Sequence, residues 1–333
     1  MSPVGIIANP ASGKDIRRVV ARASTFDNQE KQNIVRRAVA GAIAGGATRF
    51  LYMPDGYGIV SESAAEAAHE GMFEAVESPG TNSAIDTVRA ARRLAEAGCG
   101  AVITLGGDGT NRAVTLGWLD VPLVPISTGT NNVFPRFVEA TVAGAAAGLV
   151  ASGRIPLAEV QHVAKVVHAE IEDERDDLAL IDAVFLDELF VGSRAIWDAS
   201  RLKLAVLTRA QPDVVGISSI GGLLHPVTET DEHGLFVAFR GATSVLAPIA
   251  PGLYTDVPIE SFRTIPFEER VTVVGPGILA FDGERERILQ PGQSASLRII
   301  RDGPRVIDVH HTMNLAACRG LFRAPRPEVS NGN

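Results

Sequence analysis

The sequence predicts an α/β doubly wound N-terminal domain followed by a β-rich, β-sandwich-like C-terminal domain. Short apolar runs alternate with helical patterns in the first half, and β-like runs separated by turn residues fill the second half. The 333 residues are enough for two separate cores. We expect the domains to span residues 1–153 and 154–309. Residues 310–333 are expected to return toward the N-terminal domain and to be disordered at their end.

Strands and helices alternate in the first half. A buried strand at Val4–Ala8 is followed by a helical pattern at Asp15–Ala23. Asp27 is a suitable N-cap for the next helix, whose apolar residues recur with helical spacing. The later elements are a strand at Thr48–Met53, helices at Ser61–Phe73 and Ser83–Ala97, and strands at Ala101–Leu105 and Val121–Ile126. Continuous apolar strands of this kind are typical of a parallel sheet covered on both faces.

The second half is dominated by β-like runs with Gly, Pro and Asp between them. They lie at Val163–Ile171, Leu178–Phe185, Lys203–Leu207, Leu235–Arg240, Val271–Val274 and Ala295–Arg301. Repeated short strands with turn signals between them indicate a β-rich domain.

Composition and charge exclude several classes of protein. The net charge of −8, with no basic cluster that contains aromatic residues, argues against nucleic acid as a partner. The longest apolar stretches, such as Val142–Ala151, are much shorter than the roughly 20 residues of a membrane span, so no membrane association is expected. Cys99 and Cys318 lack disulfide or zinc spacing, and the N-terminus does not resemble a secretory signal. We therefore expect a cytoplasmic protein.

The most informative motif is the turn at residues 106–111, Gly-Gly-Asp-Gly-Thr-Asn, which follows a strand and precedes a helical segment. Its glycines let the backbone approach a ligand closely, and amides at a helix N-terminus attract phosphate. Asp108 would repel a phosphate unless it binds a bridging metal ion or accepts the proton of an attacking hydroxyl group. The alternative is a tight turn in which Asp108 caps the helix.

Two further polar loops leave strand ends. In the loop at residues 9–14, Ser12, Gly13 and Lys14 could offer a hydroxyl group, an amide and a cation to a triphosphate, although the spacing is not that of a Walker A loop. The loop at residues 127–132, Ser-Thr-Gly-Thr-Asn-Asn, carries side chains that suit phosphate, ribose or adenine. Ordinary polar turns are the alternative for both. Because ligands bind at the carboxyl ends of strands in doubly wound sheets, we expect all three loops to meet.

A fourth candidate lies in the β-rich half, at Phe281-Asp282-Gly283-Glu284-Arg285. Asp-Gly is a hairpin signal, so a plain hairpin is one interpretation. The other interpretation places Asp282 or Glu284 across a cleft from Asp108.

In order and spacing, these four motifs resemble those of the superfamily of NAD kinases, diacylglycerol kinases and sphingosine kinases. Residues 190–197 and 275–285 look most similar to the acetoin catabolism protein X group within it. The resemblance implies an NAD-kinase-like fold with a nucleotide in the cleft between the domains. It also implies ATP and Mg²⁺ as cofactors and a homo-oligomer as the assembly.

The motifs and the resemblance together give the candidate site residues. Asp108 and Glu284 are the catalytic candidates, and Asp108 and Asp282 are the candidate metal ligands. The nucleotide-binding candidates come from the three loops and are Asn9, Ser12, Gly13, Lys14, Gly106, Gly107, Gly109, Thr110, Asn111, Thr128, Gly129, Thr130 and Asn131.

The sequence thus predicts an ATP-dependent kinase that phosphorylates a hydroxyl group of a small acceptor. NAD(H) is the leading acceptor. A small polyol, a hydroxyketone or a lipid is the alternative, because the chain has no Thr-Pro-Thr-Gly-Ser-Thr-Ala-Tyr segment of the kind with which NAD kinases grip the dinucleotide. Thr110-Asn111-Arg112 also departs from the lipid-kinase pattern. A non-catalytic nucleotide-binding regulatory protein is the second hypothesis.

Overall fold

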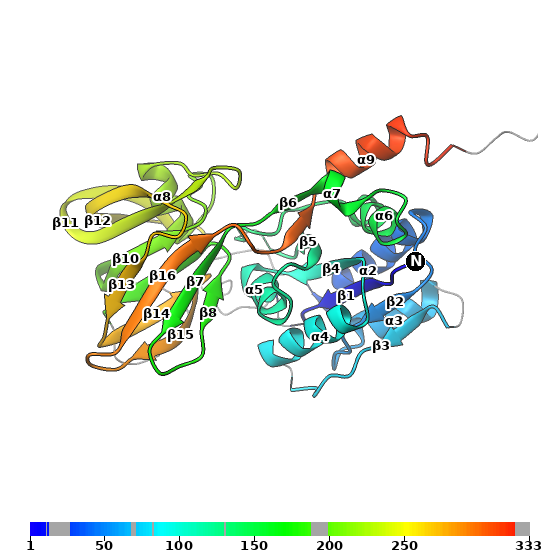
Figure 1. Cartoon of the computed structure of the whole chain (residues 1–333), viewed down its shortest axis with the longest axis horizontal. Coiled ribbons are helices and arrows are strands. Elements are labelled where there is room, and N and C mark those ends of the chain that lie inside the picture. The colour runs from blue at the N-terminus through cyan, green and yellow to red at the C-terminus, as the bar shows by residue number, and fades with distance from the viewer. Residues whose placement is uncertain are drawn as a thin grey trace, which may run out of the picture.

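The computed structural model describes residues 1–10, 12, 27–67, 71–81, 83–129, 131–187 and 199–323, without the side chains of residues 65–67 and 284–286. Figure 1 shows two domains side by side, with the last strand and helix returning to the N-terminal domain. The helix predicted at Asp15–Ala23, the segment at residues 190–197 and the end of the chain lie outside the described residues.

The N-terminal domain is built on a seven-stranded sheet with the order β3-β2-β1-β4-β5-β17-β6. All neighbours are parallel except β17 and β6. The strands are β1 (Val4–Ala8), β2 (Phe50–Tyr52), β3 (Phe73–Ala75), β4 (Ala101–Gly106), β5 (Pro122–Ser127), β6 (Gln161–Val163) and β17 (Arg305–Ile307). The strand order reverses between β1 and β4, and loops that follow strands at such a switch point bind ligands.

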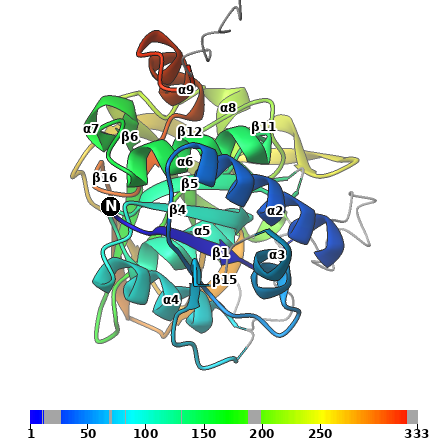
Figure 2. The same cartoon turned by 90° about the vertical axis from the view of Figure 1, so that its right-hand side faces the viewer.

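Helices cover both faces of this sheet, as Figure 2 shows for α2 and α6 on one side and α4 on the other. One face carries α2 (Asn28–Ala44), α3 (Ile59–Ala67), α6 (Ala140–Ala151) and α9 (Val309–Cys318), and the other carries α4 (Ala84–Glu96) and α5 (Asp108–Gly117). As predicted, Asp27 caps α2, because its carboxylate accepts a hydrogen bond from the Glu30 amide. The helix predicted to reach Phe73 is shorter: α3 ends at Ala67, and Phe73 begins an edge strand.

The C-terminal domain consists of two antiparallel sheets with a core between them. The six-stranded sheet contains β12 (Leu253–Pro266), β11 (His233–Ala250), β10 (Leu202–Leu207), β9 (Asp182–Leu186), β14 (Gly277–Phe281) and β15 (Glu284–Leu289), in that order. The four-stranded sheet contains β13 (Val271–Val274), β16 (Ser294–Ile300), β7 (Val166–Ile171) and β8 (Asp177–Ala179). Helix α8 (Ile217–Leu224) packs on the outer face of the larger sheet, and η1 (Ala199–Arg201) precedes β10. The predicted fold class is confirmed.

The chain crosses between the domains twice. Strands β6 and β17 lie between the expected limits at residues 153 and 309, yet both pair in the N-terminal sheet. Helix α9 then packs against α6 and the short helix α7 (Leu157–Val160). The domain limits stay a prediction. The strand pairing shows that the N-terminal sheet contains strands that precede residue 153 and strands that follow it in the sequence. Within the described ranges, no helix combines the length and apolar character needed to cross a membrane.

Candidate functional site

The turn at residues 106–109 connects β4 to α5 and has glycine where other side chains leave no room. A Cβ atom at position 106 would lie 2.4 Å from Cβ of Thr110, and one at position 107 would lie 2.7 Å from Oδ1 of Asn132. The N-cap of α5 is Gly107, which has no side chain to close the helix end. The alternative in which Asp108 caps the helix is therefore wrong, because Asp108 is its first residue.

The carboxylate of Asp108 reaches across to the third loop. Oδ1 accepts hydrogen bonds from the backbone amides of Val133 (3.1 Å) and Phe134 (2.8 Å), and Oδ2 lies 3.1 Å from the Val133 amide. These bonds fix the position of the Asp108 carboxylate, which lines the cavity between the domains. The same geometry lets Asp108 order the loop that follows β5.

Side-chain hydrogen bonds join the three strand-end loops. Asn9 Nδ2 donates to Thr110 Oγ1 over 2.9 Å, and the hydroxyl oxygens of Ser12 and Thr128 are 3.0 Å apart. The Thr128 amide also donates to the Gly106 carbonyl. The loops therefore meet as predicted. Gly13, Lys14 and Thr130 lie outside the described residues, so their contacts with nucleotide stay predictions.

Two of the loop residues have a clear role in the fold. Asn111 is fully buried, accepts a hydrogen bond from the Thr104 hydroxyl group and donates to the Gly107 carbonyl. It therefore supports the turn, and its contact with nucleotide stays a prediction. In the third loop, Ser127 Oγ donates to the Gly129 carbonyl. These bonds preset the shape of the turns before any ligand binds.

Lys31 supports the first loop from below, and the sequence analysis missed it. This fully buried residue of α2 donates through Nζ to the carbonyl oxygens of Asn9 (2.9 Å), Pro10 (3.1 Å) and Ser12 (2.6 Å). Drawing three carbonyl groups toward one ammonium fixes the path of the loop and puts a positive charge beneath it. A lone lysine in a helical pattern gives no signal of this role, since the contact depends on the packing of α2 against the sheet.

The C-terminal domain adds two more aspartates to the cleft. Asp282 sits in the β14–β15 turn with a positive φ of 50°, and its carboxylate accepts from the amides of Leu180, Ile181 and Asp182 over 2.7–3.2 Å. Asp282 is therefore more than a hairpin residue, because it ties its turn to the start of β9. Glu284 begins β15, and its side chain is outside the described residues.

Asp182 is the second site residue that sequence reasoning missed. Its side chain is buried, it lines the cleft, and Oδ1 has no hydrogen-bond partner among the described residues. Burial raises the pKa of Asp182 well above that of an ordinary aspartate, and the charges of Asp282 and Asp108 raise it further. Burial also raises the pKa of Asp282 to about 6, against the hydrogen bonds from Leu180 and the charge of Arg112. Pairs of carboxyl groups with perturbed pKa values in a cleft are typical of functional sites.

Asp108, Asp182 and Asp282 line a cavity of about 140 Å³ between the domains. Asn131 and Val133 line it from the third loop. The C-terminal domain also supplies an apolar wall: Leu202, Val215, Ile217, Ile220, Ile249, Ala250 and Pro251. The sequence predicted the polar wall in part, but gave no signal for the apolar one.

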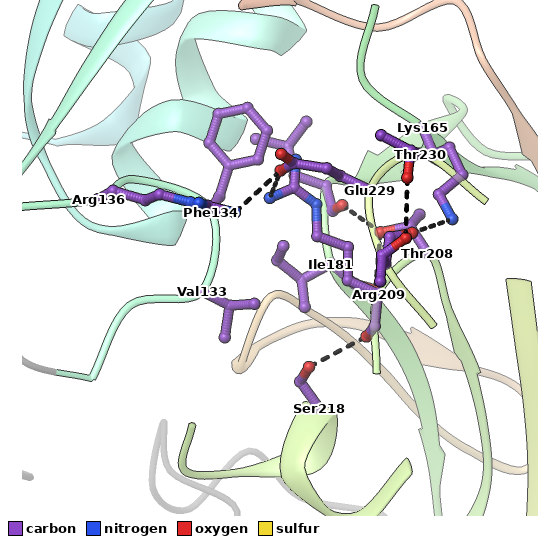
Figure 3. A network of polar contacts seen from close by, with 12 residues as sticks. Val133, Phe134, Arg136, Lys165, Ile181, Thr208, Arg209, Ser218, Glu229 and Thr230 are labelled. Carbon is purple, nitrogen blue, oxygen red and sulfur yellow. Dashed lines mark hydrogen bonds and ion pairs between the residues drawn. The ribbon is translucent and has the colours of Figure 1, made fainter. Parts of the chain in front are cut away.

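Two buried arginines connect the site to the C-terminal domain. Arg112 of α5 pairs with Asp177 over 2.5 Å and lies over the Phe281 ring. Arg209, which Figure 3 shows between Phe134 and Glu229, lies over the ring of Phe134 and pairs with Glu229 over 3.0 Å. Because Phe134 supplies an amide to Asp108, this second contact couples the position of Asp108 to the C-terminal domain.

The donor set suits a magnesium ion only in company with a nucleotide. In the described part of the chain, no group of three or more His, Cys, Asp or Glu side chains is arranged to hold a metal ion. Mg²⁺ in nucleotide sites is usually bound by one or two carboxylates together with phosphate oxygens and water. Asp108 and Asp282 supply hard oxygen atoms of the right kind, so the residues fit Mg²⁺ that enters with a triphosphate.

Comparison with known proteins places this architecture. Residues 4–155 match the model of the ATP-NAD kinase N-terminal domain, and residues 165–302 match that of the acetoin catabolism protein X C-terminal domain. The chain is 39% identical over 341 aligned positions to acetoin catabolism protein X of Cupriavidus necator, an alignment that covers 97% of this chain and 95% of that protein. The chain belongs to the acetoin catabolism protein X family. Through its N-terminal domain it is also a member of the NAD-kinase-like superfamily.

Two solved structures are similar to this chain. Yeast NADH kinase in complex with NADH is similar with a TM-score of 0.52 at 12% identity, covering 99% of this chain and 90% of that one. A diacylglycerol kinase from Bacillus anthracis aligns over 92% of this chain and 96% of its own, with a TM-score of 0.43 and 13% identity. The first similarity confirms the NAD-kinase-like fold. At 12% identity this similarity concerns the fold and not the phosphoryl acceptor.

Proposed function

We propose that this protein is a kinase that transfers the terminal phosphoryl group of ATP to a hydroxyl group of a small acceptor. The observation that carries the proposal is the junction of the three strand-end loops beside the carboxylate of Asp108. The match to the ATP-NAD kinase N-terminal domain supports ATP as the donor. A cytoplasmic location, a homo-oligomeric assembly, and the lack of nucleic-acid and membrane partners stay predictions that accompany this proposal.

The residues divide the work of phosphoryl transfer. Amides of the Gly106–Thr110 turn and polar groups of the Thr128–Asn131 loop would bind the triphosphate, helped by the positive end of α5 and the charge of Lys31. Asp108 is the first residue of α5, and its carboxylate lines the cavity. It would accept the proton of the attacking hydroxyl group. Mg²⁺, held by phosphate oxygens together with Asp108 or Asp282, would supply neutralisation of charge on the transferred group.

NAD(H) and acetoin are the first acceptors to test. NAD(H) leads from the sequence, and acetoin enters from the name of the curated relative. The decisive experiment measures ADP release from ATP and Mg²⁺ in the presence of NAD⁺, NADH, acetoin, short diols or glycerol, with Asp108→Asn as the matched inactive variant. Acceptor-dependent ADP release by the wild type, absent from the variant, is the expected result.

One observation favours a second candidate, a non-catalytic nucleotide-binding protein. Both carboxylate oxygens of Asp108 contact backbone amides, so Asp108 also has a structural role that needs no chemistry. Under this alternative ATP binds, no acceptor increases ADP release, and Asp108→Asn weakens ATP binding instead of turnover. Calorimetric titration of wild type and variant with ATP separates the two candidates.

A further inference from the structure

The charge of the cavity limits what can enter it. Asp108, Asp182 and Asp282 line it, and none of the described lining residues is Lys, Arg or His. Arg112, whose charge acts on Asp282, is already paired with Asp177 and does not line the cavity. None of these described lining residues could pair with an anionic group of a ligand, and an anion placed beside the Asp108 carboxylate without a partner is disfavoured. The described part of the lining therefore favours acceptors without a phosphate or a carboxylate.

The apolar wall limits the acceptor further. Val215, Ile217, Ile220 and Ile249 present aliphatic groups, and no aromatic residue is among the described lining residues. Such a wall favours methyl and methylene groups through the hydrophobic effect. The described residues of this wall offer no ring on which a nicotinamide or an adenine could stack.

The cavity opens to solvent, so its volume indicates how much of an acceptor it can enclose. A cavity of about 150 Å³ in another protein binds one benzene molecule, which has six non-hydrogen atoms. The 140 Å³ between the domains is therefore suited to a molecule of about that size.

Asp182 has a buried carboxyl oxygen with which a polar group of the ligand could pair. A buried carboxyl oxygen without a hydrogen bond costs about 1–3 kcal/mol, which a ligand hydroxyl group would recover. Asp108 is the proton acceptor in the proposed kinase step. Two oxygen-bearing groups on the ligand, one toward each aspartate, thus satisfy both side chains.

We infer that the phosphoryl acceptor is a short, uncharged aliphatic compound of about six non-hydrogen atoms that carries a hydroxyl group and a second oxygen atom. This inference rests on the proposed kinase function and names the substrate class of the same site. The acceptor oxygen forms a bond to the γ-phosphorus as the bond between that phosphorus and the β–γ bridging oxygen breaks. ADP leaves, and the hydroxyl proton passes to the Asp108 carboxylate and then to water.

The first test compares matched acceptors in an ADP-release assay. Butane-2,3-diol meets each criterion, 2,3-dihydroxybutanoate is its carboxylate counterpart, and NAD⁺ represents a large anionic acceptor with aromatic rings. We expect kcat/KM for the diol to exceed that for either anion at least about 100-fold, since burying an unpaired charge costs several kcal/mol.

The second test measures binding independently of turnover, by saturation-transfer NMR on the methyl groups of butane-2,3-diol. Ile217→Asn places a polar group on the apolar wall, and Leu223→Asn makes the same change on an exposed position of the same helix. We expect about a tenfold weaker diol affinity in the first variant and none of this loss in the second. Both variants should keep the ATP affinity of the wild type, which serves as the check that they fold.

The outcomes distinguish this inference from the proposed function. Phosphorylation of NAD⁺ or of the carboxylate, with no diol binding or turnover, overturns the inference and leaves the kinase standing. Diol binding that Ile217→Asn weakens, without ADP release from any acceptor, overturns the kinase and keeps the ligand class. Equal loss of diol affinity in both variants places the diol elsewhere and overturns the inference.

Discussion

The two walls of the cleft are built in opposite ways. The N-terminal wall consists of three contiguous polar loops at the carboxyl ends of β1, β4 and β5, joined by hydrogen bonds such as Asn9 to Thr110. The C-terminal wall gathers single side chains from β9, α8 and the end of β11, and most of them are apolar. The difference teaches that, under the proposed function, phosphate binding would depend on backbone geometry, whereas acceptor selection would depend on the shape and charge of dispersed side chains.

A buried lysine in each domain repeats this contrast. Lys31 donates hydrogen bonds to three carbonyl groups of the loop that follows β1. Lys165 donates to the carbonyl groups of Thr228 and His233, with a distance of 2.8 Å in both cases. Both lysines order a loop from below. Only the loop above Lys31 carries candidate nucleotide-binding residues, so the pair separates stability from nucleotide binding.

The largest expected effect comes from Asp108→Asn. Loss of the proton acceptor should lower kcat at least about 100-fold. The matched control is Asp308→Asn, because Asp308 caps α9 far from the cleft and asparagine is an equally good N-cap. Steady-state ADP release measures both variants. If the Asp108→Asn variant kept the wild-type kcat, Asp108 could not be the proton acceptor.

The next effect compares Lys31→Met with Lys165→Met. Each buried carbonyl group that loses its donor costs about 1–3 kcal/mol, so both variants should be less stable to urea than the wild type. We expect the Michaelis constant for ATP to rise about tenfold in Lys31→Met only, which corresponds to about 1.4 kcal/mol. Equal Michaelis constants in the two variants would show that the loop above Lys31 does not contact the nucleotide.

A smaller effect concerns the pH dependence that Asp182 contributes. Its pKa is higher in the folded than in the unfolded chain, so the folded state binds more protons and stability is lost as pH rises through the folded pKa. Asp182→Asn cannot ionise, and the variant should therefore have a higher Tm than the wild type at pH 8, by about 2–4 °C for each kcal/mol recovered. The difference should shrink as the pH approaches 4. A Tm difference that stays constant from pH 4 to pH 8 would show that the buried charge is not its source.

The smallest effect is expected from Ser12→Ala. This change removes the hydroxyl group that lies 3.0 Å from Thr128 Oγ1 and loosens one of the links between the loops. A neutral hydrogen bond contributes about 1 kcal/mol, so the Michaelis constant for ATP should rise by no more than about fivefold. A rise as large as that of Lys31→Met would mean that the hydroxyl group contacts the nucleotide itself.

The sequence predicted what depends on neighbouring residues. Apolar periodicity gave the order of the N-terminal elements, and the Gly-rich turn after β4 identified the position of Asp108. Asp182 and Lys31 were missed because their roles arise only when distant segments pack, one across the two domains and the other beneath a loop. Helix α8 was missed as well, although three of its residues line the cavity. Its Ser- and Gly-containing sequence has weak intrinsic helix propensity, and its place on the β-sheet compensates.

The most direct test of the two-walled site is a crystal structure of Asp108→Asn with ATP, Mg²⁺ and butane-2,3-diol. We predict the triphosphate on the amides of the three strand-end loops, with the diol between residue 108 and Asp182 and its methyl groups against Ile217 and Ile249. A nucleotide bound elsewhere, or a triphosphate on the loops with its γ-phosphorus remote from residue 108, would contradict the account.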